Sequence, residues 1–293
     1  MTSTTDDPRL ALLFALADDE LIMGHRHSEW TGWAPHIEED LAFSSIAQDE
    51  MAHARLLYGL AKEATGRDED SLALGRQPAE YRNAVLTERT NRDWGYTLAR
   101  HYLYDTADDV RLAAVAESSW QELAELTGVI RLEERYHLDH ARAWFERLAS
   151  GPQTGRQKLA EGFLAAVGEA VALFEPLPDE ERLVADGVLP RSSEEMLGEW
   201  LAGLGEALEA VSLDYVLEHH GLIGGEMVPT STGEIEAGAD ELAVPGIVRR
   251  DGRWAHEGAF AGAGGRHGRH SEDFEPLWDE MTRLYREHPG ATW

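Results

Sequence analysis

The 293-residue chain contains no cysteine and only two lysines, Lys62 and Lys158. Without cysteine it can form no disulfide, no thiolate zinc site and no iron–sulfur cluster, and it has no cysteine nucleophile. Its formal charge of −29 argues against partners such as nucleic acid or an anionic membrane, since both bind clustered basic side chains. This acidity fits either a salt-rich cytoplasm or ordinary solvated acidic faces.

Membrane-length apolar runs and strand-like patterns are also missing. The N-terminus is polar and acidic where a secretory signal would be basic and then apolar, so we expect a cytoplasmic protein. Alternating β-branched residues are scarce, which argues against a sheet-based core. A hydrophobic content of 43% is nevertheless ample for a buried interior. The composition therefore predicts an all-α fold.

Helix-period apolar spacing indicates several long helices. They are expected at about 8–27, 35–66, 92–117, 119–150, 155–174 and 193–220. Ser119-Trp-Gln-Glu122 and Ser192-Ser-Glu-Glu195 match the capping-box pattern at helix starts. The segment 67–91 is mixed and predicts short helical turns over one end of an antiparallel bundle.

Composition divides the chain into three parts. Residues 8–220 form the predicted bundle, and 221–270 form a Gly-rich irregular excursion with a weak strand-like stretch at 246–248. Residues 271–293 are predicted to form a C-terminal helix and tail that pack on the bundle or on a partner.

Two Glu-x-x-His motifs, Glu50-Met-Ala-His53 and Glu134-Arg-Tyr-His137, lie inside the helical patterns. At about 100° per residue, positions i and i+3 project from one face of a helix, so both side chains of a motif can reach one metal ion. Glu20 precedes Glu50 by 30 residues, and Asp105 precedes Glu134 by 29. A gap of this length fits a helix, a reversal and an antiparallel return.

One carboxylate from each of two helices and Glu-x-x-His from each of two others is the ligand set of a four-helix bundle that holds two metal ions. Mixed carboxylate and imidazole ligands suit iron or manganese. A buried polar network without metal is the other interpretation. Spacing alone favours Glu20 over Asp18 or Asp19, and Asp105 over Asp108 or Asp109.

Other side chains near the motifs have predicted supporting roles. A carboxylate is expected to accept the second ring N–H of each ligand histidine, and the candidates are Asp49, Asp108, Asp109 and Asp139. Core packing is favoured over a redox or hydrogen-bonding role for Tyr102, Tyr104 and Tyr136. Trp30 and Trp33 are expected to anchor packing or a contact between subunits.

The remaining histidines match no ligand spacing. Surface or core hydrogen-bonding roles are expected for His25, His27, His36 and His101. Solvated side chains are expected for His219, His220, His267 and His270.

Several longer stretches resemble a known family. They are Asp18–Trp30, Ala34–Leu41, Ala54–Tyr58, Ala99–Tyr102, Arg135–Leu138, Trp144–Leu148 and Pro289–Trp293. With them the chain resembles the C-subunit family of bacterial and archaeal phenylacetyl-CoA epoxidases, which are multicomponent ring-1,2-epoxidising oxygenases of the ferritin-like class. The resemblance covers nearly the whole chain apart from the Gly-rich excursion.

The resemblance implies a ferritin-like helical bundle that pairs with a homologous catalytic subunit. In such complexes the catalytic subunit holds two irons and epoxidises phenylacetyl-CoA, and electrons come from NADPH through a separate flavin and iron–sulfur reductase. The C subunit is usually structural, with an eroded metal site. This chain departs from that pattern, because it has residues that match the order of metal ligands in the catalytic subunit. They are Glu20, Glu50, His53, Asp105, Glu134 and His137.

Three functions therefore stay open. The chain is an oxygenase subunit with a working di-iron centre, or a structural subunit that preserves ancestral ligands, or a ferritin-like protein that oxidises or stores iron. A homodimer is an alternative to the heteromeric assembly.

Overall fold

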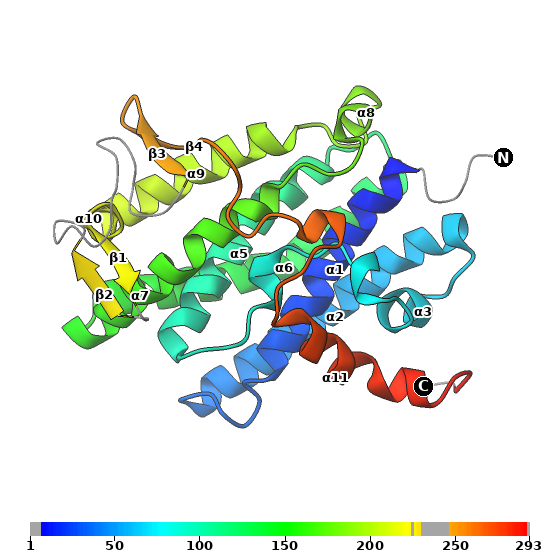
Figure 1. The fold of residues 1–293 in the computed structure, drawn as a ribbon, viewed down its shortest axis with the longest axis horizontal. Helices are drawn as coiled ribbons and strands as arrows, with labels where there is room; N and C mark the ends of the chain where they lie inside the picture. The colour runs from blue at the N-terminus through cyan, green and yellow to red at the C-terminus, as the bar shows by residue number, and fades with distance from the viewer. Residues whose placement is uncertain (1–6, 224–225, 230–245, 292–293) are drawn as a thin grey trace.

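The computed structural model describes residues 7–223, 226–229 and 246–291, which form a bundle of long helices with two small hairpins at one end (Figure 1). The rest of the predicted Gly-rich excursion, at 224–225 and 230–245, lies outside the described residues. The all-α prediction is confirmed, and the architecture is that of a ferritin-like antiparallel bundle.

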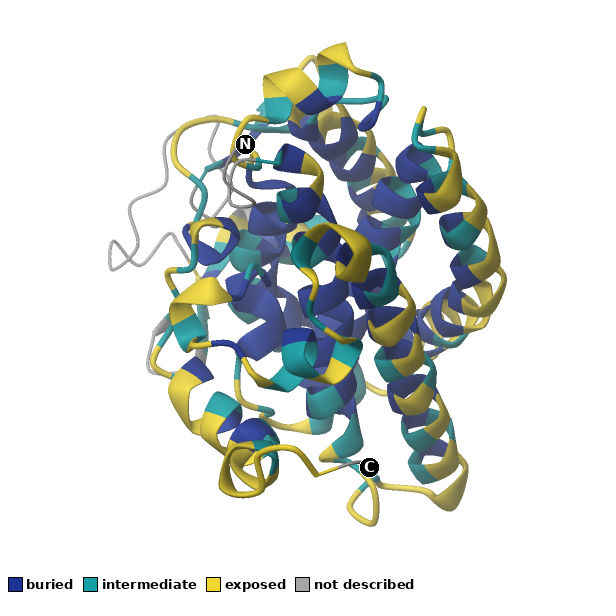
Figure 2. Ribbon diagram, turned by 90° about the vertical axis from the view of Figure 1, so that its right-hand side faces the viewer, coloured by how far each residue is buried: buried dark blue, intermediate teal, exposed yellow. Residues whose placement is uncertain are grey.

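Helices α1 (Pro8–Ser28) and α2 (Ile37–Thr65) form the first hairpin. Asp7 caps α1 by accepting the Arg9 backbone N–H at 3.0 Å. Gly66 ends α2 in the left-handed conformation, with a φ of 68°. Helix α1 is buried on nearly all sides, which places its acidic residues in the interior of the bundle (Figure 2).

Helices α5 (Trp94–Val115) and α6 (Gln121–Ala149) form the second hairpin, and α6 also packs against α2. The predicted capping box at Ser119 is wrong. The Ser119 hydroxyl donates to the Asp186 carbonyl at 2.8 Å, and Trp120 occupies the N-cap of α6 without a side-chain hydrogen bond. A tertiary contact has taken the hydroxyl that a local cap would use.

Helices α7 (Gln153–Ala170) and α9 (Ser193–Ala210) pack on α5, and the short η2 (Val171–Phe174) continues α7 and packs against α9. The capping box at Ser192 is confirmed. The helix predicted over 193–220 is interrupted, because Ser212 adopts a φ of 57° between α9 and the short α10 (Asp214–His219).

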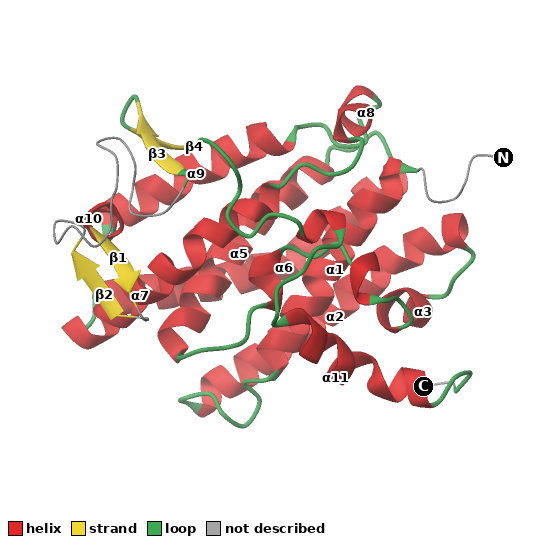
Figure 3. Ribbon diagram, viewed as in Figure 1, coloured by secondary structure: helices red, strands yellow, loops and turns green. Residues whose placement is uncertain are grey.

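Short elements close the two ends of the bundle. Three of them, α3 (Glu69–Leu74), η1 (Pro78–Glu80) and α4 (Val85–Glu88), confirm the short helical turns predicted within 67–91. A fourth, α8 (Glu180–Ala185), comes later in the chain. The hairpins pair β1 (His220–Ile223) with β2 (Glu226–Pro229), and β3 (Ile247–Arg250) with β4 (Arg253–His256) (Figure 3). Strand β3 confirms the predicted strand-like stretch.

The chain then returns across the bundle through η4 (Gly265–His267) to α11 (Phe274–Glu287), which packs on α3 and η1. A Cβ atom on Gly265 would lie 2.1 Å from the Asn83 carbonyl oxygen, so only glycine allows this approach. The prediction of a solvated His270 is wrong, because its side chain is 7% exposed and lies 2.8 Å from Glu88. Among the described residues no helix is long and apolar enough to span a membrane.

Candidate metal centre

The predicted ligands are carried by the four inner helices: Glu20 on α1, Glu50 and His53 on α2, Asp105 on α5, and Glu134 and His137 on α6. All six side chains are buried, with exposed fractions of 8% or less. Polar groups from four helices therefore lie in the interior of one bundle.

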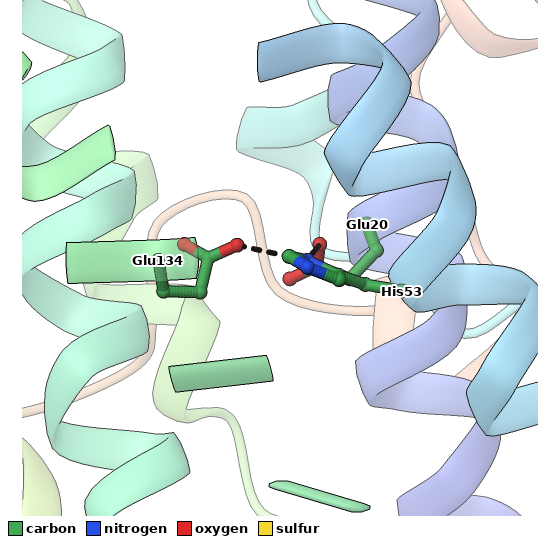
Figure 4. Close-up of side chains that lie close together, drawn as sticks. All are labelled: Glu20, His53 and Glu134. Carbon is green, nitrogen blue, oxygen red and sulfur yellow. Dashed lines mark hydrogen bonds and ion pairs between the residues drawn. The ribbon is translucent and has the colours of Figure 1, made fainter. Parts of the chain in front are cut away.

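Three of these residues form a compact group. One ligand atom each from Glu20, His53 and Glu134 lies within 4.8 Å of the others (Figure 4). The Nδ1 atom of His53 is 3.2 Å from Glu20 Oε2 and 3.0 Å from Glu134 Oε1. Carboxylate oxygens and an imidazole nitrogen at this separation could hold a metal ion between them.

Glu134 also joins the second histidine. Its Oε1 atom lies 3.1 Å from His137 Nδ1, so the Nδ1 atoms of both His53 and His137 face the same carboxylate. Glu134 thus has the position of a carboxylate that could bridge two metal ions.

Glu50 and Asp105 lie beside this group without joining it. Glu50 Oε2 is 2.9 Å from His27 Nδ1, and Asp105 Oδ2 is 3.2 Å from His101 Nδ1. Glu50 Oε1 is buried with no hydrogen-bond partner, and the buried atoms Asp105 Oδ2, Glu134 Oε1 and His137 Nδ1 have only the ion-pair contacts given above, whose angles are poor for hydrogen bonds. Orphaned acceptors of this kind are costly in a protein interior, and they are the atoms that a bound cation would satisfy. The donor set therefore fits metal ions.

The Nε2 atom of each motif histidine lies close to the acidic residue that directly precedes the other motif. His53 Nε2 lies 2.8 Å from Glu133 Oε2, and His137 Nε2 lies 3.3 Å from Asp49 Oδ2. Such contacts fix the ring orientation and leave Nδ1 free to face a metal. Asp49 was among the predicted candidates and Glu133 was missed. Both residues directly precede a motif glutamate, which is a signal that the sequence does contain.

The ionisation of the cluster is strongly perturbed. Burial and the neighbouring Glu134 raise the pKa of Glu20, and burial raises that of Glu50. Burial would lower the pKa of His53, but the adjacent carboxylates of Glu134 and Glu20 raise it to about 12. Burial would raise the pKa of Glu134, yet both histidines hold it at about 2, and Glu134 raises that of His137 to about 9 against its burial. A binding cation would displace these protons.

The acidic neighbours of Glu20 have other partners. Asp18 accepts from Arg76 Nη1 at 2.9 Å, and Asp19 accepts from Arg111 at 2.5 Å and from Arg266 at 2.7 Å. These guanidinium groups neutralise Asp18 and Asp19 within the core. Spacing alone favoured Glu20 among the three residues, and in the structure only Glu20 faces the two motifs.

The alternatives to Asp105 are also occupied elsewhere. Asp108 accepts from Arg111 Nη2 at 2.5 Å, and Asp109 is 47% exposed and 3.5 Å from Arg131. Asp139 is exposed. None of these three supports a motif histidine, whereas Asp105 faces the interior beside His101.

Rings pack tightly against the Glu50 and Asp105 side of the cluster. Phe43 is fully buried, with ring centroids 5.0 Å from His27, 5.3 Å from His101 and 4.9 Å from Trp94. His101 continues to His140 at 3.1 Å. His27 and His101 therefore have the core hydrogen-bonding roles that were predicted for them.

The three tyrosines have different roles. Tyr102 stacks on Phe145 at 4.3 Å, which confirms packing. The hydroxyl of the buried Tyr104 donates to Glu20 Oε1 at 3.3 Å, so it combines packing with a hydrogen bond to a predicted ligand. The prediction of a packing role is wrong for Tyr136, because this residue is 74% exposed.

Comparison with known proteins identifies relatives of the chain. A model of the phenylacetic acid catabolic protein family matches residues 1–218. The chain is 30% identical over 286 residues to the C subunit of the 1,2-phenylacetyl-CoA epoxidase of Escherichia coli strain K12, an alignment that covers 97% of this chain and 98% of the relative.

Proposed function

The chain belongs to the phenylacetic acid catabolic protein family, and we propose that it is a subunit of a cytoplasmic multicomponent phenylacetyl-CoA oxygenase that carries its own pair of metal ions. The observation that carries the proposal is the convergence of Glu20, His53 and Glu134 within 4.8 Å, next to orphaned ligand atoms. The ligands would be Glu20, Glu50, His53, Asp105, Glu134 and His137. Iron is proposed, and manganese suits the same atoms.

The residues of the chain would have distinct tasks at this centre. Glu134 would hold the metal together with both motif histidines, because its Oε1 atom faces both histidine Nδ1 atoms. Glu133 and Asp49 would hold the imidazole rings by their outward nitrogens. Bound iron would supply the reduction of dioxygen that ring epoxidation requires. Electrons would come from NADPH through a separate flavin and iron–sulfur reductase.

Metal analysis of the purified protein tests the centre directly. We expect about two iron ions per chain after growth with ample iron, since two histidines and four carboxylates supply one pair of sites. Glu50→Gln with His53→Gln should remove that iron while the far-ultraviolet circular dichroism stays unchanged. His36→Gln is the matched control, because His36 is exposed at the N-cap of the same helix. Wild-type protein that contains neither iron nor manganese would refute the metal centre.

A non-catalytic structural subunit of the same complex is the second candidate. The ring packing of Phe43 against His27, His101 and Trp94 favours it, because these side chains fill the space beside Glu50 and Asp105 that a bulky aromatic substrate would need. The ring chemistry would then take place on a homologous subunit.

The two candidates differ in the assembled complex. If this chain oxidises the substrate, Glu50→Gln with His53→Gln should abolish phenylacetyl-CoA epoxidation. If it is structural, the complex should keep its rate while this subunit loses its metal.

A further inference from the structure

His101 lies one helical turn before Asp105 on α5, and its ring is placed like those of the two motif histidines. His101 and Asp105 are four residues apart, so they share one face of the helix. Both are buried, with exposed fractions of 0% and 3%. The Nδ1 atom of His101 is 3.2 Å from Asp105 Oδ2, just as His53 Nδ1 is 3.2 Å from Glu20 Oε2. Each of these imidazoles therefore turns the same nitrogen toward a buried carboxylate.

The second ring nitrogen of His101 is held from the outer side, as Glu133 and Asp49 hold those of the motif histidines. His101 Nε2 is hydrogen-bonded to His140 Nδ1 at 3.1 Å, and His140 Nε2 is hydrogen-bonded to Glu39 Oε2 at 2.9 Å. The side chains of His140 and Glu39 are 19% and 12% exposed, so these bonds lead outward from α5 through α6 to α2. A ring held in this way keeps its Nδ1 atom directed inward.

A count of the N–H groups leaves the contact between His101 and Asp105 without a proton. A neutral imidazole carries a single N–H, so two neutral rings supply two. The carboxylate of Glu39 can only accept, so His140 donates from Nε2 and its Nδ1 atom accepts from His101 Nε2. His101 Nδ1 then has only a lone pair, and that lone pair faces the oxygen of Asp105.

The geometry of this contact agrees with the count. Its angles are poor for a hydrogen bond, and within the described residues neither His101 Nδ1 nor Asp105 Oδ2 has a hydrogen-bond partner. Two acceptors that face each other in a protein interior are costly unless a cation lies beside both. Two ligand atoms at about 2.1 Å from one metal ion are separated by roughly 3.0–3.5 Å, a range that includes the distance between these two atoms.

We propose that His101 is a further metal ligand, which binds through Nδ1 beside Asp105 and adds a third imidazole to the candidate centre. The inference rests on the metal centre proposed above. Imidazole and carboxylate together suit iron or manganese, as they do at the motif histidines. His101 also lies close to the Glu50 side of the centre, because His27, 2.9 Å from Glu50 Oε2, packs edge-on against its ring with centroids 5.1 Å apart. Ligand spacing in the sequence did not indicate His101, since it belongs to no Glu-x-x-His motif.

Cobalt(II) is the probe, because it binds the same ligand types as iron(II) and shifts the NMR resonances of the residues that bind it. In water, each histidine bound through Nδ1 gives one strongly shifted, exchangeable Nε2–H resonance. The full-length wild-type chain loaded with cobalt(II) should therefore show three such resonances, from His53, His137 and His101. His101→Phe should show two, and the exposed His36→Gln should keep all three.

The variant should keep its fold, since the ring of Phe43 already lies 5.3 Å from that of His101 and a phenyl ring fits among these side chains. Far-ultraviolet circular dichroism and thermal melting of the metal-free protein check this, and His101→Gln replaces a variant that does not fold. His101→Phe should also weaken cobalt binding at least about 10-fold in metal titrations, because even the loss of an outer partner of a ligand has an effect of that size.

The outcomes separate this inference from the proposed function. Two shifted resonances in the wild type, or three that all remain in His101→Phe, overturn His101 as a ligand and leave the metal centre of the motif residues standing. If His101 only orients Asp105, both proteins show two resonances while the affinity falls in the variant, and the ligand assignment is again overturned. A wild-type chain that binds no cobalt removes the metal centre and the inference together.

Discussion

Asp19 and Glu20 are adjacent on α1 and both are buried, yet they belong to two different kinds of charged interior. Burial would raise the pKa of Asp19, but the guanidinium groups of Arg266 and Arg111 lower it below its usual value. Burial and the nearby Glu134 raise the pKa of Glu20 instead. One carboxylate has its cations built into the fold, and the next does not.

The difference extends through both clusters. In the first, the carboxylates of Asp18 and Asp19 face the guanidinium groups of three arginines, namely Arg76, Arg111 and Arg266. In the second, four carboxylates face imidazole rings, and several of their oxygens have no hydrogen-bond partner. A carboxylate that faces guanidinium groups of the chain needs no further cation, whereas a cluster of carboxylates short of positive charge can bind one.

The arginine-matched cluster should give the largest effect on stability. Arg266→Ala would remove a guanidinium group that donates to Asp19 at 2.7 Å and to the Leu173 carbonyl at 2.9 Å. Breaking a buried pair in this way should lower the free energy of unfolding by about 3–5 kcal/mol, measured by urea denaturation of the metal-free protein. Arg253→Ala, at an exposed position, should change it by less than about 0.5 kcal/mol. A loss below about 1 kcal/mol for Arg266→Ala would contradict the comparison.

At the second cluster, added metal should change the stability of the fold more than mutation of a carboxylate does. At a free metal concentration 100 times the Kd, a bound ion should stabilise the wild-type fold by about 2.7 kcal/mol. Glu50→Gln should abolish that gain, yet leave the metal-free protein as stable as wild type or more so, because it removes one of four crowded carboxylates. Anaerobic thermal melts with and without iron(II) or manganese(II) measure both effects. An equal gain in wild type and variant would place the metal elsewhere.

Helical periodicity carried most of what the sequence could predict about the candidate centre. Spacings of 30 and 29 residues located Glu20 and Asp105 relative to the motifs, because antiparallel helices of similar length bring such positions level. Spacing favoured Glu20 over Asp18 and Asp19, but it could not show which groups those two carboxylates contact. Their arginine partners lie 58 to 247 residues away, and a periodic pattern contains no record of such contacts.

The segment that returns across the bundle was the least predictable part of the fold. Its glycines indicate a loop by composition, but Gly265 is needed because the Asn83 carbonyl would lie 2.1 Å from a Cβ atom there. That approach carries Arg266 into the core, where it is 1% exposed. Composition reports that a segment lacks bulky side chains and cannot distinguish a flexible arm from a closely packed one.

The partly exposed ion pair between Arg89 and Asp273, at the start of α11, should give the smallest change in the free energy of unfolding when it is mutated. Asp273 is 26% exposed, lies 3.1 Å from Arg89 Nη1, and accepts from the Thr90 hydroxyl at 2.7 Å. Burial would raise the pKa of Asp273, but Thr90 and Arg89 lower it. Solvent screening at this exposure limits the expected cost of Asp273→Asn to about 1 kcal/mol at neutral pH.

The pH dependence of this pair has a defined sign. Because the folded pKa of Asp273 is depressed, its contribution is present above the unfolded value of about 3.9 and is lost as the pH falls through the lower folded value. The difference in unfolding free energy between wild type and Asp273→Asn should therefore shrink as the pH is lowered from 7 to 3 in urea titrations. Glu275→Gln, an exposed residue on the same helix, should show no such convergence. If the difference in unfolding free energy between wild type and Asp273→Asn stays constant or grows as the pH falls, the pair acts through its shape and hydrogen bonds rather than its charge.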